Sequence, residues 1–349
     1  MDLKKIFLKD ACPTQIGGQA IMEGIMMKGE NRTAIAMRLP DDRIYLRTEK
    51  NKKRGKLSKI PIVRGVVVFI NSLVTGTGTL MKSAEILERF TEEDPAENSK
   101  FEKWVSDNFS MEKAWNILLV LTVILSLLFT VVVFVLFPTA AVNWLGRFTD
   151  SVILLNLVEG VFRIVLFVAY VLLISKMEDI KRVFQYHGAE HKTIHCLEKS
   201  LELTPENAQQ FYTLHPRCGT SFLVFVMVIS LIVFSLMGWP NLLIRLLSRI
   251  LLIPVVAGLS YELLRWAGRS NNLLVEILSM PGLYLQKITT KEPDDKMLEV
   301  AIVAVKAVLV DDDAPLVEGI SDLEGNIITN KEDLDEFKRT DKSGNKESE

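Results

Sequence analysis

The segment "YHGAEHKTIHCLE", residues 186–198, concentrates side chains that can bind a metal ion. His187, His191 and His195 follow one another at intervals of four, and Glu190 lies between the first two. Residues four apart on a helix lie one turn above each other, so neighbouring members of this trio can direct two imidazoles at one ion. The outer two are about 12 Å apart along a helix, too far for a shared ion. We therefore expect His187 and His191 to be ligands and His195 to pack beside the site.

The order of these residues also matches a catalytic pattern. "HGAEH" follows the H-x-x-E-H order of inverted zinc peptidases, in which two histidines bind the metal and the glutamate acts as a base towards water. The pattern makes Glu190 the candidate catalytic residue. Histidines near a membrane can also cap helices or bond backbone carbonyls, but here all four histidines of the chain lie within 29 residues, which favours metal binding.

A catalytic metal needs a third protein ligand, and the sequence offers three candidates. His215 and Cys218 stand together in "HPRCG", and Glu262 stands in "SYELLRWAG". Three protein ligands leave a position for substrate, whereas joining both His215 and Cys218 to His187 and His191 would close the site and make it structural. The expected cofactor is a divalent metal, with zinc (Zn2+) favoured, although such ligands also accept manganese or iron.

The elements that position this segment are apolar helices. Of the 349 residues, 49% are apolar, and most of these fall in four stretches that can cross or nearly cross a hydrocarbon core of about 30 Å. These stretches are Asn116–Phe137, Ser151–Ile174, Ser221–Met237 and Leu242–Leu264. The sequence therefore predicts a mainly α protein, a polytopic bundle of four transmembrane helices over residues 116–264, with the lipid bilayer as its partner. A net charge of −2 gives no positive electrostatic field that would attract a nucleic acid, so no nucleic-acid partner is expected.

Lysine and arginine placement predicts the orientation. The loop 175–220 carries six such residues, whereas the connection 138–150 carries Arg147 alone. The positive-inside rule then puts this His/Cys loop and both termini in the cytoplasm, at a bacterial inner membrane. Charges among the first fifteen residues argue against a cleavable signal peptide. In this reducing compartment we expect Cys12 and Cys196 to be ordinary buried thiols.

The flanking regions have distinct patterns. Residues 1–60 hold a Gly/Met-rich segment and a β-hairpin signal around Pro40, which predicts a small cytoplasmic α+β region. Within 61–115, the stretch Ile62–Met81 has a polar second half, so we expect an interfacial or re-entrant helix followed by a connector. Residues 265–310 predict a cytoplasmic amphipathic helix, and the acidic residues 311–349 predict a disordered tail.

Ionisable residues also occur inside the expected spans. Glu159 and Arg163 are four apart in the second span, and Arg245 and Arg249 are four apart in the fourth. Glu159 and Arg249 both lie about 12 Å from the outer ends of their spans, so they can be partners across the bundle. Charges at this depth are usually functional, which raises the competing hypothesis of a transporter that uses Glu159, Arg163 and Arg249.

Several motifs, taken together and in order, resemble one family. They are "GGQAIMEGIMMKG", "PIVRG", "YHGAEHKTI", "HPRCGTSF" and "KEPDDKMLEVAI", and they cover roughly residues 12–310. They resemble the YqhQ-like bacterial membrane proteins, a family that carries a domain-of-unknown-function label and is described as predicted metal-dependent enzymes. The resemblance implies roles for these positions: Glu23, Arg64, His187, Glu190, His191, His215, Arg217 and Cys218. Glu23 can equally be a turn residue.

The leading hypothesis is a metal-dependent hydrolase at the cytoplasmic membrane face, acting on a peptide, a membrane protein or a lipid-like substrate. In it, His187 and His191 bind the ion, Glu262 or His215 completes the ligand set, and Glu190 activates water, whereas Cys218 is a thiolate ligand in the structural alternative. The alternatives are a non-enzymatic membrane scaffold or sensor with a structural metal site, and the transporter.

Overall fold

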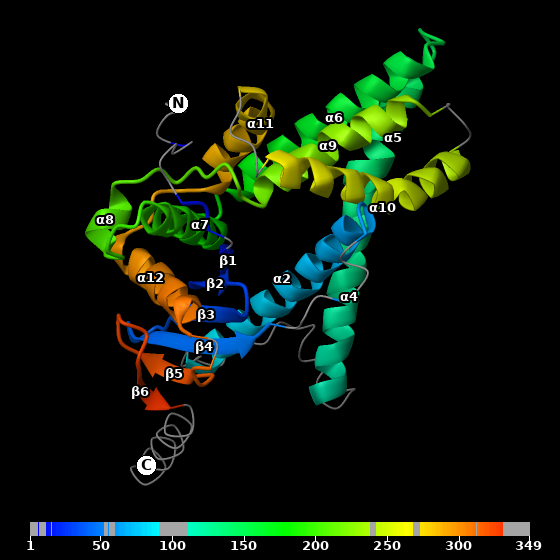
Figure 1. Cartoon of the computed structure of the whole chain (residues 1–349). Coiled ribbons are helices and arrows are strands. Elements are labelled where there is room, and N and C mark those ends of the chain that lie inside the picture. Colours follow the sequence, from blue (N-terminus) through cyan, green and yellow to red (C-terminus); the bar gives the residue numbers. More distant parts are fainter. Residues whose placement is uncertain are drawn as a thin grey trace. The chain divides into compact units, whose positions relative to one another are not determined.

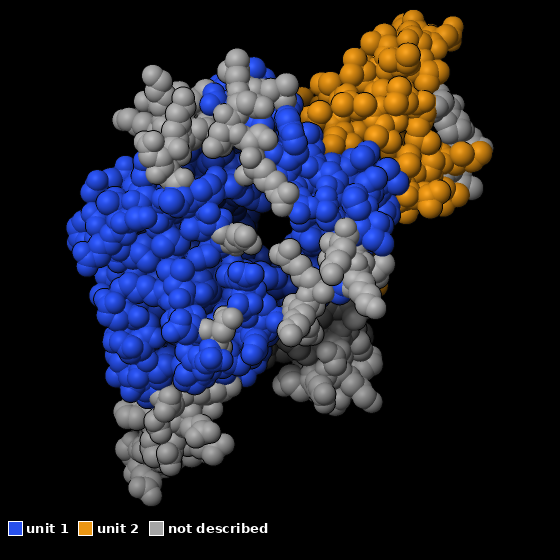
Figure 2. Space-filling model, viewed as in Figure 1, with its two compact units in different colours: residues 1–90, 171–226, 253–349 blue, residues 91–170, 227–252 orange. Residues whose placement is uncertain are grey.

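Figure 1 shows a computed structural model of the chain, which describes residues 6, 12–14, 16–51, 55, 60–90, 111–237, 242–267, 273–311 and 313–330. The chain forms two compact units, coloured separately in Figure 2. Unit 1 comprises residues 1–90, 171–226 and 253–349, and unit 2 comprises residues 91–170 and 227–252. All the predicted metal ligands belong to unit 1.

Unit 1 is built on an antiparallel sheet of six strands that follow one another in chain order. The strands are β1 Gly17–Ile21, β2 Gly24–Lys28, β3 Arg32–Arg38, β4 Ile44–Lys50, β5 Glu318–Ser321 and β6 Ile327–Asn330. The expected hairpin is present as β3 and β4, and its turn includes Asp42 in the left-handed region with a φ of 69°. The predicted N-terminal region therefore contains an antiparallel sheet, and this sheet also includes two strands from the far end of the chain.

Successive side chains on a strand point to opposite faces of the sheet, and helices cover both faces here. On one face, side chains such as Ile25 and Leu46 pack against α7 (Glu178–Glu198) and α12 (Asp295–Leu309). On the other face, Met26 and Tyr45 pack against Ile86 near the end of α2 (Val63–Phe90). Figure 1 shows α7 and α12 on the same side of the sheet. The histidine helix is thus held by a packed core.

The C-terminal region departs from expectation in two ways. The single amphipathic helix expected within 265–310 is instead two helices, α11 (Leu273–Thr289) and α12, and α12 is buried on more than one side because Leu298, Ile302 and Val303 are covered as well. The expectation of a disordered tail from residue 311 is wrong for residues 318–330, which form β5 and β6. β5 pairs with β4, and β6 pairs with β5, so these four-residue strands depend on a long-range pairing that their sequence pattern does not predict. Residues 331–349 lie outside the described part of the chain.

Four helices are long and apolar enough to cross a membrane, as judged by length and composition within the described residues. They are Val63–Phe90, Leu121–Leu145, Val152–Ile174 and Leu247–Ala267. The second combines α4 (Met111–Val131), a π-helical turn η2 (Val132–Leu136) and α5 (Phe137–Leu145), the third is α6, and the fourth lies in α10 (Leu242–Ala267). The chain is a mainly helical, multi-pass membrane protein, as predicted.

The set of long helices differs from the four expected spans at two places. The expected span Ser221–Met237 is the 16-residue helix α9 (Thr220–Ser235), which is apolar but shorter than the other spans. The stretch Ile62–Met81 belongs to α2, a continuous helix of 28 residues without the break of a re-entrant element. Its polar groups do not break the helix, since the Thr79 hydroxyl donates to the Thr75 carbonyl at 2.8 Å and Ser83 donates to Leu80 at 2.7 Å.

Candidate metal site

The helix α7 places His187 and His191 one turn apart, and backbone carbonyls fix both rings. Nδ1 of His187 donates to the carbonyl of Thr289 at 2.8 Å, and Nδ1 of His191 donates to the carbonyl of Thr213 at 2.5 Å. A carbonyl only accepts, so each ring keeps a proton on Nδ1, and the neutral form of the ring presents a lone pair on Nε2. Metal-binding histidines are oriented by such outer hydrogen bonds. The fold therefore aims both Nε2 atoms in the way a metal ligand requires.

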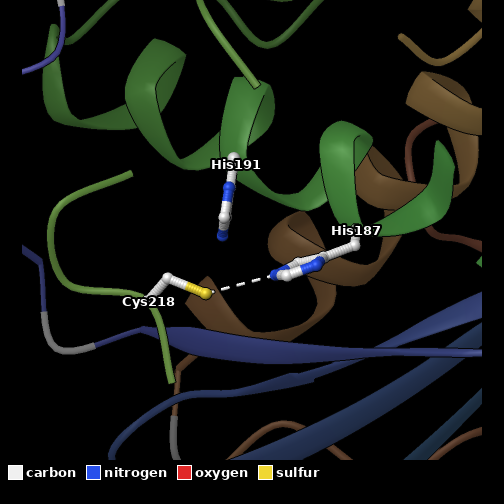
Figure 3. Close-up of side chains that lie close together, drawn as sticks. All are labelled: His187, His191 and Cys218. Atoms are coloured by element: carbon white, nitrogen blue, oxygen red, sulfur yellow. Dashed lines mark hydrogen bonds between the residues drawn. The ribbon is translucent and has the colours of Figure 1, made fainter. Parts of the chain in front are cut away.

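Cys218 completes this group from the segment between α8 (Pro205–Gln209) and α9. Its Sγ lies 3.2 Å from Nε2 of His187, and the ligand atoms of His187, His191 and Cys218 all lie within 4.8 Å of one another. Figure 3 shows the three side chains converging on a common point. Tetrahedral zinc with bonds of about 2.0 Å to nitrogen and 2.3 Å to sulfur requires donor separations of this order.

One potential ligand atom of this group, a buried imidazole nitrogen, has no hydrogen-bond partner among the described residues. Nε2 of His191 is buried, and no hydrogen-bond partner for it is present among the described residues. The side chain of His191 is 1% exposed, so water does not satisfy the atom from the surface. A buried polar atom without a partner is costly. A metal ion shared with His187 and Cys218 would satisfy it, so the donor set fits the predicted divalent cofactor.

The electrostatics of the group favour the ligand form of the cysteine. Burial acts to raise the pKa of the Cys218 thiol, but His191 and His187 outweigh it and lower the pKa well below its ordinary value. Burial acts to lower the pKa of His187, but the Cys218 thiolate beside it raises that pKa to about 9. Thr220 also donates to the sulfur through its hydroxyl and amide, at 3.3 and 3.4 Å. The thiolate is the form of cysteine that binds metals.

Glu190, the predicted catalytic residue, is buried beside this group on the same helix. The amide of Gly18 in β1 donates to its Oε1 at 2.9 Å. Burial raises the pKa of Glu190, and the neighbouring His187 and His191 act in the opposite direction. A Cβ at Gly18 would lie 2.8 Å from the carboxyl carbon of Glu190, so only glycine lets β1 approach this closely. The "GGQ" sequence therefore positions a carboxyl group with a raised pKa next to the histidines.

His215, one of the competing third ligands, belongs to a second buried group with His195 and Glu198. Its Nδ1 accepts from the amide of Arg217 at 3.3 Å, so a neutral ring carries its proton on Nε2, which lies 3.5 Å from Glu198. No free lone pair remains on His215 for an ion. Burial lowers the pKa of His215 to about 3 and that of His195 to about 4, so both rings are neutral.

Glu198 is the residue of this second group that the sequence reasoning missed. Burial acts to raise its pKa, but His215 and Arg217 outweigh burial and lower the pKa to about 2. Its carboxylate is 2.5 Å from Arg217 and also accepts from the amide of Thr14 at 3.1 Å. A helical signal was available, because Glu198 follows His191 by seven residues and His195 by three. We interpret the second group as a structural network next to the candidate metal site.

Glu262, the other competing third ligand, lies elsewhere in unit 1. Its carboxylate accepts two hydrogen bonds from Arg64 of α2, from Nη2 and from Nε, the latter at 2.6 Å. It also accepts a hydrogen bond from the amide of Ile62. Both oxygens of Glu262 are therefore occupied. In the structure, this residue is the ion-pair partner of Arg64 and not the expected metal ligand. The "PIVRG" motif thus joins α2 to α10.

Glu23 is a turn residue that joins β1 and β2 to α7. Its φ of 50° lies in the left-handed region, between the two strands. Its carboxylate accepts two hydrogen bonds from Arg182 near the start of α7, and Tyr186 lies within 3.4 Å. Among the described residues, Glu23 is not a member of either group of potential metal ligands.

Comparison with known proteins places the chain in a family. It is 36% identical over 302 residues to "Uncharacterized protein YqhQ" of Bacillus subtilis (strain 168), a match that covers 84% of this chain and 92% of that protein. No solved structure matches. Residues 60–311 match the family described as "Protein of unknown function (DUF1385)". This range includes α7, Cys218 and α12. The chain therefore belongs to the DUF1385 family.

Proposed function

We propose that this protein is a metal-dependent hydrolase, with zinc as the favoured ion and a site formed by His187, His191 and Cys218. The observation that carries the proposal is the buried Nε2 of His191, which has no partner among the described residues and faces a second imidazole and a thiolate. Three protein donors are the number found in catalytic zinc sites, which keep one position open. The side chain of His187 is only half-buried, which gives this group a route to solvent.

A bound divalent ion would supply Lewis acidity and make water a nucleophile near neutral pH. The protein's own residues would do the rest. His187 and His191 are held in the correct tautomer by Thr289 and Thr213. Glu190, whose pKa is raised by burial, would accept the proton of the attacking water and pass it to the leaving group. The amide of Gly18 would hold the Glu190 carboxylate in place during both transfers.

The proposed location is the cytoplasmic face of the inner membrane. β4 pairs with β5, and α7 and α12 pack together on that sheet, so these segments share one side of the membrane. An even number of crossings must then separate β4 from α7, and α7 from α12. The pair α4–α5 and α6 meets this condition, as does the pair α9 and α10. The basic residues of 175–220 favour the cytoplasm for that side.

In this topology α2 is an interfacial helix. It is long and apolar enough to span, but its second half lies against the sheet. The hydroxyl of Thr79 is 3.4 Å from the sulfur of Met26, and Ile86 packs into the cluster on that face of the sheet. A site beside such a helix suits a peptide, a membrane protein or a lipid-like substrate.

A structural metal site is the second candidate, and burial favours it. His191, Glu190 and Cys218 are at most 8% exposed, as in a site that holds the sheet, α7 and the 213–220 segment together. In that case the protein would be a membrane scaffold or sensor, and Glu190 would serve only to bond Gly18.

Metal analysis with two variants separates these candidates. The full-length protein is incubated with membrane extract in ¹⁸O-labelled water, since hydrolysis of any substrate places the label in a product. Glu190→Gln should keep the metal and lose labelling by about 10²-fold or more, because a general base is removed. His191→Ala should lose both the metal and the labelling, and Glu178→Gln, an exposed carboxylate on the same helix, should lose neither. If Glu190→Gln gives as much labelling as the wild type, hydrolysis by this site is excluded. If the wild type binds the metal but neither it nor any variant gives labelling, the structural candidate is favoured.

A further inference from the structure

The strand β1 forms one edge of the sheet. It is the first strand in the sheet order, and among the described strands it pairs with β2 alone. A strand at the edge of a sheet presents backbone N–H and C=O groups with which another extended chain can pair. The helix α7 packs beside this edge, since the amide of Gly18 in β1 bonds to Glu190. A further strand that joined the sheet here would therefore lie next to the proposed metal ligands.

The backbone groups of β1 that point away from β2 can be identified from this one hydrogen bond. In antiparallel pairing, residues bonded to the partner strand alternate with residues whose N–H and C=O groups point away from it. The amide of Gly18 donates to Glu190 of α7 at 2.9 Å, so Gly18 is of the second kind. Ala20 is two residues further along the strand and has the same orientation. The amide and carbonyl of Ala20 and the carbonyl of Gly18 therefore point to the outer edge.

The outer edge of β1 is accessible. Gly17 is exposed, and Gly18 and Ala20 are half-buried. A Cβ on Gly17 would meet no atom within 4 Å, so the space beside the start of the strand is open. Within the described part of the chain, neither outward group of Ala20 has a hydrogen-bond partner. These groups are thus available to a ligand.

Antiparallel addition of a strand to this edge would place a peptide bond at Glu190. All neighbouring strands of this sheet run antiparallel, and a strand added in the same way exchanges two hydrogen bonds with Ala20. The residue two positions later in the added strand lies opposite Gly18, and its carbonyl points to the amide that Glu190 already holds. Glu190 is the proposed base and directly precedes His191. The peptide bond after the residue opposite Gly18 is therefore the bond that this site would cleave.

We propose that the substrate is an extended polypeptide that joins the sheet as a strand at the outer edge of β1. This inference rests on the proposed hydrolase function and adds its substrate class. The outward carbonyls of Gly18 and Ala20 need donors at the spacing of a strand, and alternate backbone amides of an extended chain supply them. The ester group that a lipid hydrolase cleaves has acceptors and no donor, so it would leave both carbonyls unpaired. A polypeptide is thus the substrate that this edge fits.

The first test identifies the substrate class with the full-length protein in non-ionic detergent. Membrane extract and a synthetic mixture of decapeptides of randomised sequence are incubated separately with the protein in ¹⁸O-labelled water. The new carboxyl termini of cleaved decapeptides should carry the label. Label confined to lipid products would overturn this inference and leave the proposed hydrolase standing. Absence of label from every product would overturn the proposed function and this inference with it.

A peptide found to be cleaved then reports its own register on β1. Methylation of the backbone nitrogen removes a donor at the residue before the cleaved bond, opposite Gly18, or at the residue two positions earlier, opposite Ala20. Either change should lower kcat/KM by about tenfold or more. Methylation of the residue between them is the matched control, because its amide points away from β1, and it should leave kcat/KM unchanged. Equal losses at all of these residues, or at none of them, would overturn strand addition.

A proline in β1 makes the corresponding change in the protein. Ala20→Pro removes the outward N–H and places a ring at the edge, while the bonds between β1 and β2 remain, as is usual for proline in edge strands. The variant should keep its metal and lower kcat/KM by about tenfold or more. Met22→Pro is the control, since it places the same ring at an exposed turn position outside the pairing with β2 and should cleave as the wild type does. Peptide cleavage by Ala20→Pro at the wild-type rate would overturn the proposal, and if that variant does not fold, the methylation pattern on wild-type protein decides.

Hydrogen exchange tests the added strand without turnover. The Glu190→Gln protein should bind the cleaved peptide without hydrolysing it, because it lacks the proposed base. Addition of that peptide should slow the exchange of β1 amides, measured by mass spectrometry, because the outward amide of Ala20 gains a partner. Unchanged exchange in β1 at a peptide concentration well above the wild-type KM would overturn strand addition.

Discussion

Gly188 directly follows the first proposed metal ligand on α7, where the helix backbone packs closely against the segment around Lys291. A Cβ on Gly188 would lie 2.0 Å from the carbonyl oxygen of Lys291 and 3.1 Å from the methyl group of Thr213. A backbone atom cannot rotate away as a side chain does. Gly188→Ala must therefore push α7 and the segment around Lys291 apart by about 1.5 Å to restore an ordinary contact distance.

The energetic cost follows from what that separation breaks. Lys291 donates its amide to the carbonyl of Phe184 at 2.9 Å, and His187 donates to Thr289 at 2.8 Å. Each hydrogen bond is worth about 1 kcal/mol, and overpacking costs a further 1–3 kcal/mol or so. Alanine regains about 1 kcal/mol of helix propensity. The net loss of folding free energy should be about 2–4 kcal/mol, together with a disoriented His187.

Thermal unfolding of the purified full-length protein, with metal content measured in parallel, checks this estimate. A loss of this size should lower the melting temperature by roughly 5–15 °C for a unit of this size, and bound metal should fall with it. Gly78→Ala is the matched control, since Gly78 also lies in a helix and a Cβ there meets no atom within 4 Å. A Gly188→Ala protein with wild-type melting temperature and full metal content would refute the close packing of α7 on this segment.

Two further predictions concern the cysteines and the topology. Maleimide labelling followed by mass spectrometry should leave Cys196 unmodified in the folded protein, because burial raises the pKa of its thiol to about 11. Cys218 should react only after a chelator has removed the metal, and equal reaction with and without chelator would count against its role as a ligand. Fluorescent proteins that mature only in the cytoplasm should be bright when inserted after Ile60 or after Asp311, because β4 and β5 belong to one sheet. One bright and one dark fusion would contradict the even number of crossings, and two dark fusions would contradict the cytoplasmic orientation.

The sequence was most informative where chemistry and helical spacing agree. An interval of four placed His187 and His191 on one helix face, and the structure brings both together with Cys218. Spacing could not choose between His215 and Cys218, since they are three residues apart in a segment without regular structure. The choice depends on which atom Arg217 donates to, and this is set by the local path of the backbone.

Long-range pairing was beyond the reach of the sequence. Glu262 was a plausible ligand because it is acidic and near the end of a span, yet Arg64, 198 residues away, occupies its carboxylate. The strands β5 and β6 have four residues each, in an acidic segment with little alternation, so their pairing depends on the edge that β4 provides. The hairpin of β3 and β4 was predictable because a turn separates two alternating runs that need only each other.

The sheet that carries β1 to β4 cannot be finished when those strands leave the ribosome. The edge of β4 stays unpaired until β5 is synthesised, and one face of the sheet stays uncovered until α12 is synthesised. α12 begins about 245 residues after β4 ends. At about 5–20 residues per second, translation takes roughly 12–50 s to cover that interval, which includes the long apolar helices of the described residues. For that time an apolar face and an open strand edge are exposed to association with other chains. Biogenesis of this protein should therefore depend on a factor that shelters the first four strands until the last ones arrive.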